Sequence, residues 1–541
     1  MTKFNKKTSF SEKLAKNPNK TVNYMGETAY TISDSKEKLL NLVATSMISE
    51  NKYYESGEKS DSKIVQAISE VAEEDPKFIL QLANYIRSEL YLRSAPTFLL
   101  AHAASMEETK PFVREYTPKV IQRADELVEV LQLYKNTFLP AVGKKHTFPA
   151  SLKKGVAAAF GKFDEYQFSK YDKDGEMKLK DALRIVIGFL NEDDKERRKL
   201  YQKILDGTLE TPETWEVIIS GWKDQGFDSK KKAWEHVIDL WTDGQKVNNY
   251  MALIRNLRNI LEEKVSSKHM DKVINAIKNE KAVINSKQLP FRFLSAYENL
   301  GEQEAMFEKD KSHFKQIKEA LNEAIQISVK HNVPKIPGKT IITADNSGSA
   351  RGDYGGKSQI SLKSVRSMAD TGNLLALMAW YASEDTMVSV FGDKLSFIEP
   401  DRKKGILDNF KLIDKAGQDV GQSTEEGVFL MLEKMIREEI FADRLIVCSD
   451  LQIGDGKHGE YGRERGRPTG AGSIPDLVDK YRRTINPKFV YYSVCFNGHG
   501  NDVIIGPKKA LISGWSDNIL KFIQMFEKDK KSVIEHIESK Y

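Results

Sequence analysis

The stretch GKTIITADNSGS, residues 338–349, decides the fold of the C-terminal part of this chain. Its apolar run around Ile341 and Ile342 is typical of a buried strand, and the polar residues 345–349 follow directly. Downstream, strand-like runs such as RLIVC at 444–448 alternate with helical patterns. Strands that alternate with helices, and that are apolar along most of their length, predict a doubly wound parallel sheet covered on both faces.

The residues before this stretch carry a different pattern, because apolar residues recur at helical spacing from about residue 33 to 330 without strand alternation. Asp75-Pro76, for example, predicts a helix start, since the carboxylate caps free N–H groups and proline suits the first turn. Paired helices with short polar connections and no strict sequence period favour a HEAT-like helical-repeat array. Several unrelated helical bundles would give the same pattern, and the sequence leaves that alternative open.

Two prolines and a glycine in HNVPKIPGKT, residues 331–340, end the last helical pattern and mark a domain boundary. We therefore predict a basic N-terminal tail at 1–30, a helical array at 31–335 and the sheet domain at 336–541. The expected fold class is α plus α/β, with a HEAT-like helical-repeat part followed by a doubly wound domain.

The composition is that of an ordinary globular protein. The 541 residues carry 83 Lys and Arg against 78 Asp and Glu, and 40% are hydrophobic. No stretch approaches 18 consecutive apolar residues, and no apolar segment follows the positively charged N-terminus. We therefore predict a cytoplasmic protein without a membrane span or a secretory signal. The only two cysteines, Cys448 and Cys495, exclude a disulfide framework.

The polar residues after the first strand have the pattern Asp345-x-Ser347-x-Ser349. In an open α/β sheet, ligands bind at the carboxyl ends of the strands, which is where this loop is expected. Thr424 opens a later helix and Asp450 ends the run RLIVCSD, so both are expected at the same edge. Carboxylate and hydroxyl oxygens are ligands that suit Mg²⁺. The alternative is a serine-rich turn that only caps a helix.

This set of residues resembles the metal-ion-dependent adhesion site of von Willebrand factor A domains. The resemblance implies that Asp345, Ser347, Ser349 and Thr424 bind the ion directly or through water, and that Asp450 acts through those ligands. It also implies an open coordination position that receives an acidic group of a partner.

The order of a helical array and then an A domain resembles the Ro autoantigen family. The strings that carry this resemblance lie at 151–184, 252–259 (ALIRNLRN), 289–298 (LPFRFLSAYE) and 338–349. The resemblance implies a ring of HEAT-like helices, the TROVE module, closed by the A domain. It further implies binding of small noncoding Y-like RNA and of single-stranded ends of misfolded RNA, with an RNA-processing exonuclease as a possible protein partner.

Ten basic residues are candidate RNA contacts: Lys153, Lys154, Lys162, Lys170, Lys173, Lys178, Lys180, Arg184, Arg255 and Arg258. Contacts from such residues to phosphates make binding salt-dependent and weakly sequence-specific. Tyr166 and Tyr171 lie among the lysines and can stack on unpaired bases. Acidic residues interleave with the lysines, so a solvated helix surface is the alternative. Arg255 and Arg258, three apart, are expected on one helix face lining the hole of the ring.

One position departs from the family pattern. Family members often carry a histidine, associated with Y RNA contact, three residues after the arginine of a K-D-x-L-R string, and this chain has Ile187 there. The sequence therefore favours general RNA binding over specific recognition of Y RNA.

These observations predict a Ro-type RNA-binding protein that acts in a ribonucleoprotein for RNA quality control or processing and that is not an enzyme. The main alternative is a protein-interaction scaffold with metal-dependent docking and no RNA role. A metal-dependent nuclease is disfavoured, because the site offers one directly binding carboxylate whereas two-metal nucleases need more acidic ligands.

Overall fold

The computed structural model describes most of the chain. The described residues are 20–22, 28–45, 57–139, 147–172, 175–190, 193–212, 214–243, 250–301, 311–352, 358, 366–422, 424, 427–453, 473–496, 501–504, 508–513, 519–529 and 533–541. No helix in these ranges is both long enough and apolar enough to span a bilayer.

The first part of the molecule is helical, as predicted. Asp75 starts its helix in the expected way, because its carboxylate accepts from the Phe78 N–H ahead of Pro76. The helices before the sheet domain are α2 (Ser35–Thr45), α3 (Gly57–Glu74), α4 (Pro76–Ser88), α5 (Ser94–Ser105), α6 (Lys110–Val120), α7 (Ala124–Phe138), α8 (Ala150–Phe160), α9 (Glu165–Tyr171), α10 (Leu179–Val186), α11 (Lys195–Asp206), α12 (Trp215–Ser220), α13 (Lys230–Thr242), α14 (Tyr250–Arg255), α15 (Leu257–Glu262), α16 (Ser267–Ile277), α17 (Glu280–Ser286), α18 (Pro290–Gly301) and α19 (Lys311–Asn332).

The second part is a six-stranded sheet in the order β5-β4-β3-β6-β7-β9. All neighbouring strands are parallel except the β4–β5 pair. In the register, Ile342 of the central strand lies beside Val388 on one side and Ile446 on the other. The strands are β3 (Ile336–Asp345), β4 (Ser383–Phe391), β5 (Leu395–Ile398), β6 (Arg444–Ser449), β7 (Val490–Cys495) and β9 (Lys509–Ser513).

Helices cover both faces of this sheet. Ile342 packs in one hydrophobic cluster with residues of α21 (Met368–Ala382), α22 (Ile406–Gln418) and α26 (Ile519–Asp529). Its neighbour Ile341 points to the other face and packs with residues of α23 (Gly427–Arg437) and α25 (Ile474–Thr484). This alternation confirms the predicted doubly wound architecture.

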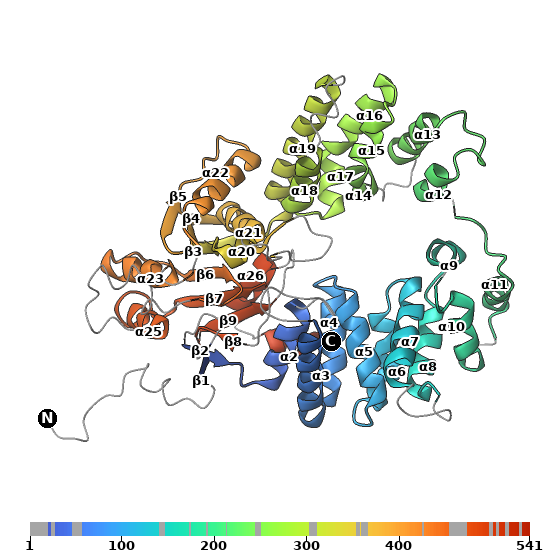
Figure 1. The fold of residues 1–541 in the computed structure, drawn as a ribbon, viewed down its shortest axis with the longest axis horizontal. Coiled ribbons are helices and arrows are strands. Elements are labelled where there is room, and N and C mark those ends of the chain that lie inside the picture. The colour runs from blue at the N-terminus through green and yellow to red at the C-terminus, as the bar shows by residue number, and fades with distance from the viewer. Residues whose placement is uncertain are drawn as a thin grey trace.

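The helices and the sheet domain are arranged in a ring, which confirms the predicted fold class (Figure 1). The helical array runs from α2 at the bottom of the view, past α11 on the right, to α19 at the top. The sheet domain lies on the left, where α2 contacts β9 and α19 contacts α22.

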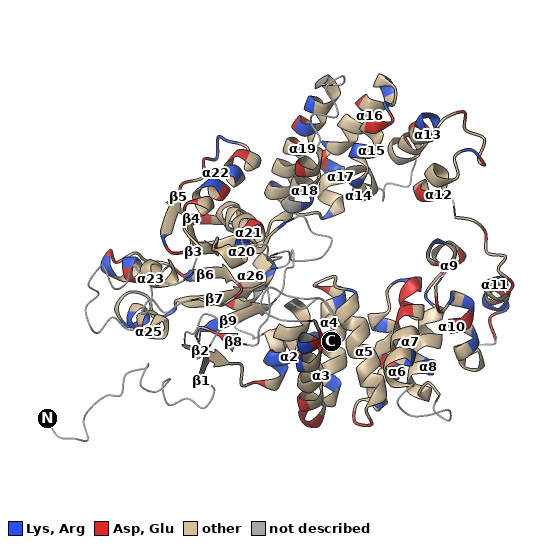
Figure 2. Ribbon diagram, viewed as in Figure 1, with Lys and Arg blue, Asp and Glu red and all other residues tan. Residues whose placement is uncertain are grey.

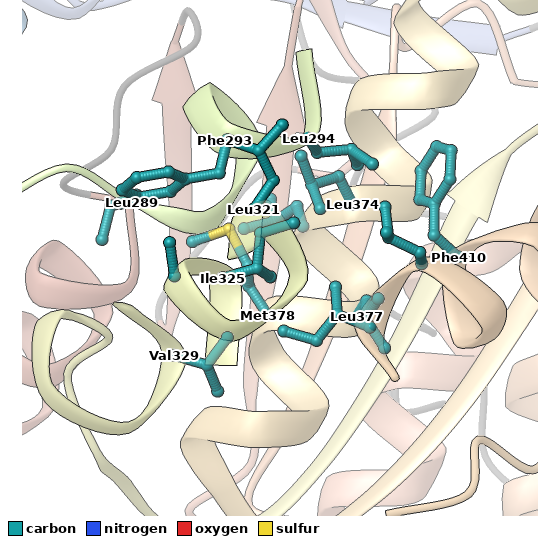
Figure 3. Packing of buried hydrophobic residues seen from close by; sticks show 14 of the residues in the cluster. Leu289, Phe293, Leu294, Leu321, Ile325, Val329, Leu374, Leu377, Met378 and Phe410 are labelled. Atoms are coloured by element: carbon teal, nitrogen blue, oxygen red, sulfur yellow. The ribbon is translucent and has the colours of Figure 1, made fainter. Parts of the chain in front are cut away.

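The hydrophobic cores divide the ring differently from the sequence pattern. One core contains buried side chains between Leu39 and Ile204, together with Ile537. A second core begins at Ile218 and continues without a break from the later helices into the sheet domain. Figure 3 shows this continuity in Leu289, Phe293 and Leu294, in Leu321, Ile325 and Val329 of α19, and in Leu374, Leu377, Met378 and Phe410 of the sheet domain.

Segments near both ends of the described chain pack against parts of the molecule that are distant in sequence. Strands β1 (Lys20–Val22) and β2 (Thr28–Thr31) form a small sheet with β8 (Asn501–Asp502), so the segment predicted to be a tail contains strands attached to the sheet domain. Helix α27 (Val533–Lys540), which follows the sheet domain in sequence, packs on α4 in the first half of the ring.

Candidate functional site

The loop after β3 brings three of the predicted metal ligands together. Asp345 is the last residue of β3 and is 2% exposed. Its Oδ1 accepts from the Ser347 backbone N–H at 3.0 Å, and the hydroxyls of Ser347 and Ser349 are 3.3 Å apart. Ser347 precedes the short helix α20 (Gly348–Arg351), whose first turn places Ser349 beside Ser347.

Asp450 reaches the same place from the end of β6. The hydroxyl of Ser449 donates to Asp345 Oδ2 at 2.6 Å and lies 3.4 Å from Asp450 Oδ1. Asp450 Oδ1 also accepts from the Gln452 backbone N–H at 2.9 Å. Asp450 Oδ2 is buried and accepts no hydrogen bond of normal geometry from the described residues. The Ser449 hydroxyl therefore contacts two buried carboxylates, and the Oδ2 atom of Asp450 can still accept a hydrogen bond.

Thr424 completes the set. Its buried hydroxyl donates at 2.7 Å to the Gln452 carbonyl, next to the backbone that binds Asp450. The Gly348 N–H donates at 2.8 Å to the Gln422 carbonyl, which ties the first loop to the segment that carries Thr424. The structure thus brings all five predicted ligands to one edge of the sheet, from three different loops.

The two buried carboxyls of this site are costly to ionise together. Burial raises the pKa of the Asp345 carboxyl above its usual range. Burial, and secondarily the charge of Asp345, raise the pKa of Asp450 to about 7. A divalent cation would relieve both costs, because opposite charge and direct ligation stabilise the ionised carboxylates. The donor set of carboxylate and hydroxyl oxygens fits Mg²⁺.

Sequence reasoning missed two residues of this site, Ser449 and Gln452. Ser449 had an available signal, because it directly precedes Asp450 at the end of an apolar strand. Gln452 acts through its backbone, which no side-chain pattern reveals. Between them, Leu451 has φ of 62° and is fully buried, an arrangement that L residues adopt rarely and that the surrounding packing must hold in place.

Several of the predicted RNA contacts lie beside aromatic rings in the first half of the ring. The amino groups of Lys153 and Lys154, on α8, are 5.4 and 5.9 Å from the centre of the Phe189 ring. The amino group of Lys170, on α9, is 5.8 Å from the centre of the Tyr166 ring. Phe189 and Tyr166 are exposed. Phe189 ends the short 3-10 helix Ile187–Phe189 after α10, so cations and exposed rings occur together on and beside α8 and α9.

Lys162 differs from the other candidate RNA contacts in its hydrogen bonds. Its ammonium donates to the carbonyls of Pro118 and Ile121, at the end of α6. Burial lowers the pKa of the Lys162 ammonium. Two of its three donors are used within the fold, although the side chain is exposed, so fewer of its donors are open to RNA than the sequence indicates.

The other candidate RNA contacts, between residues 173 and 184, differ in their exposure and pairing. Lys178 precedes α10 and Lys180 lies in its first turn, both half-buried. Arg184 is exposed and pairs with Asp181 at 3.4 Å. Lys173 lies outside the described residues. Figure 2 shows both signs of charge on the helices of this region, as the interleaved sequence indicates.

Arg255 and Arg258 do not share one helix as predicted. Arg255 ends α14 and Arg258 lies in α15, with Asn256 between the two helices. Both side chains are exposed, and Arg258 pairs with Glu262 at 2.7 Å. These helices belong to the second hydrophobic core, whereas α8, α9 and α10 belong to the first. The structure therefore places the predicted RNA contacts in two separate groups.

Comparisons with known proteins agree with this architecture. The family model described as TROVE domain matches residues 17–207 and 205–319. The two matches meet where the first hydrophobic core ends, after Ile204 and before Ile218.

Two curated relatives are both described as telomerase protein component 1. The protein from Mus musculus is 23% identical over 363 residues, and that from Rattus norvegicus is 24% identical over 359 residues. These matches cover 53% and 52% of this chain but only 13% of each relative, so the chain corresponds to a small part of them.

Among solved structures, the chain is similar to the crystal structure of the Deinococcus radiodurans RO (RSR) protein. The similarity has a TM-score of 0.61 and covers 92% of this chain and 100% of that one. The sequences are 14% identical, so this similarity speaks for the fold alone.

Proposed function

Because this chain belongs to the TROVE domain family, we propose that it is an RNA-binding protein that works in a ribonucleoprotein. The observation that carries the proposal is the family match together with a ring of helices closed by a sheet domain. We propose small structured RNA with single-stranded ends as its ligand, of the Y-like or misfolded kind, and RNA quality control or processing as its role. We propose an exonuclease as the partner class for such a role.

The surface chemistry of α8 and α9 supports this proposal. Lys153, Lys154 and Lys170 supply positive charge for phosphates, and the exposed rings of Phe189 and Tyr166 are suited to stacking on unpaired bases. Ile187 is exposed where family members often carry a histidine, and its side chain cannot form a hydrogen bond. We therefore propose that this surface recognises RNA mainly by charge and stacking.

The test is filter binding of an RNA hairpin with a single-stranded 3′ tail, measured at several salt concentrations. A triple variant with Lys153→Glu, Lys154→Glu and Lys170→Glu is expected to bind at least about 10-fold more weakly and with a shallower salt dependence, since fewer counterions are released. The matched control places the same charge change on the sheet domain, with Lys403→Glu, Lys404→Glu and Lys411→Glu. If the parent protein binds no RNA at low salt, the proposal fails and a protein-interaction scaffold becomes the better reading.

We propose that Asp345, Ser347, Ser349, Thr424 and Asp450 hold a divalent cation, with Mg²⁺ the natural choice for these oxygen donors. The bound ion would supply an open coordination position for an acidic group of a partner. The supporting observation is the buried Asp450 Oδ2, which accepts no hydrogen bond of normal geometry from the part of the chain that the structure describes. We further propose that the ion serves docking rather than catalysis, so RNA incubated with the protein and Mg²⁺ should stay intact.

An Asp345→Asn variant is expected to lose at least about 100-fold in affinity for Mn²⁺, used as a probe in titration calorimetry, because a direct charged ligand is removed. The control is Asp408→Asn, an exposed carboxylate on α22 of the same domain. Equal Mn²⁺ affinity in the parent protein and the Asp345→Asn variant would rule out this site.

A further inference from the structure

Arg351 ends the short helix that follows the metal-binding loop, and its side chain is largely buried, with 18% exposed. The Nη2 atom donates to Asn346 Oδ1 at 2.9 Å, to the Asp414 carbonyl at 3.0 Å and to Asp414 Oδ1 at 3.2 Å. The Nε atom donates to the Gly417 carbonyl at 3.2 Å. A single guanidinium thus joins the loop to the last turns of α22.

Asn346 is the residue through which Arg351 contacts the loop. It lies between Asp345 and Ser347 and is 1% exposed. Its side chain exchanges two hydrogen bonds with Asn373 of α21, at 2.8 and 3.0 Å, and its backbone N–H donates to the Phe391 carbonyl at 2.8 Å. The position of Asn346 therefore fixes the directions in which the side chains of Asp345 and Ser347, both proposed metal ligands, point.

The packing around this contact has no spare room. A Cβ added to Gly417 would lie 2.1 Å from Asn346 Oδ1 and 2.5 Å from Arg351 Nη2. Only glycine at this position allows α22 to approach the loop so closely. The guanidinium charge is balanced by Asp414, so its effect on a nearby cation is mainly geometric.

We propose that Arg351 is a positioning residue that holds the Asp345–Ser349 loop in its metal-binding shape before the ion arrives. This inference rests on the proposed metal site and adds to it a residue outside the ligand set. A loop that is already ordered binds an ion more tightly, because binding then has no ordering cost to overcome.

The test is an Arg351→Lys variant, which keeps the charge but cannot donate to Asn346, Asp414 and Gly417 at once, since lysine lacks the planar fork of arginine. Its affinity for Mn²⁺ is expected to fall about 10- to 100-fold, as is typical when residues behind metal ligands are changed. Hydrogen exchange at the Ser347 and Gly348 amides in metal-free buffer is expected to rise. The control is Arg402→Lys, which alters an arginine stacked on Trp380 in the same domain.

The outcomes separate the two proposals. If the parent protein binds Mn²⁺ and Arg351→Lys binds it equally well, the role of Arg351 is overturned while the metal site stands. If the parent protein binds no Mn²⁺, the metal site fails, and the exchange rates then decide whether Arg351 orders the loop. Should Arg351→Lys fail to fold, Asp414→Ala removes the side-chain acceptor of the guanidinium and is expected to change both readouts in the same direction. Unchanged readouts in that variant overturn the proposal.

Discussion

An Asp450→Asn variant is expected to be more stable than the parent protein in metal-free buffer at pH 8, by up to about 4 kcal/mol. Burial and the charge of Asp345 raise the pKa of Asp450 from 3.8 to about 7 in the folded protein, and each pKa unit corresponds to about 1.4 kcal/mol. Between these two values the folded protein binds more protons than the unfolded chain, so its stability falls as the pH rises. Replacing the carboxylate by an amide removes this loss.

The measurement is urea unfolding in EDTA at pH 5 and pH 8, with the exposed Asp408→Asn change as the control. The advantage of Asp450→Asn should be clearly larger at pH 8, because the parent carboxyl is mostly protonated at pH 5. Adding Mn²⁺ should reverse the order of stability, since the ion would stabilise the ionised parent site. An advantage that is equal at both pH values would contradict the assignment of two buried, interacting carboxylates.

An Ile537→Ala variant is expected to destabilise the first half of the ring by about 2–5 kcal/mol, although Ile537 follows the whole sheet domain in sequence. Ile537 is fully buried among side chains that otherwise come from residues 39–204. Polar contacts hold α27 in the same place. The Gln81 side chain donates to the Glu538 carbonyl at 3.2 Å, and the Tyr541 hydroxyl donates to Glu89 at 2.8 Å. Loss of the buried side chain weakens both the core and the closure of the ring.

The measurement is hydrogen exchange followed by peptide mass spectrometry, which reports the two cores separately. The matched control is Ile523→Ala, a fully buried isoleucine of α26 in the second core. Ile537→Ala should raise exchange in residues 57–139, and Ile523→Ala should raise it in the sheet domain instead. If both variants loosen the whole molecule equally, the ring unfolds as one unit and the two cores are not independent.

Much of the candidate site was predictable because its chemistry lies in short, local patterns. A strand end followed by Asp345-x-Ser347-x-Ser349 placed a ligand loop at the edge of the sheet, and Asp450 followed a second apolar strand in the same way. Parallel strands bring their carboxyl ends to one edge, so these residues had to converge once the sheet formed. The contribution of Arg351 was not predictable, since its partners lie on α22, more than 60 residues further along the chain.

The sequence also misplaced features that depend on local breaks and on distant acceptors. Arg255 and Arg258 have the spacing of one helix face, but a turn at Asn256 separates α14 from α15. There the Asn256 side chain and its backbone N–H both donate to the Ala252 carbonyl. Lys162 lies among lysines that predict a basic surface, and carbonyls at the end of α6 accept from two of its three donors. Composition records the charge of a residue but not which acceptor lies within its reach.

The sequence by itself determined the two kinds of architecture, the strand that carries the candidate metal-binding loop and the identities of the candidate ligands. Hydrophobic periodicity and capping residues act over a few residues, so they can be read without knowing the fold. Only the tertiary structure decided that the later helices share a core with the sheet domain, that β1 and β2 pair with β8, and that α27 closes the ring on α4. These features depend on which apolar surfaces meet after folding, and the segments that meet lie from tens to hundreds of residues apart in the sequence.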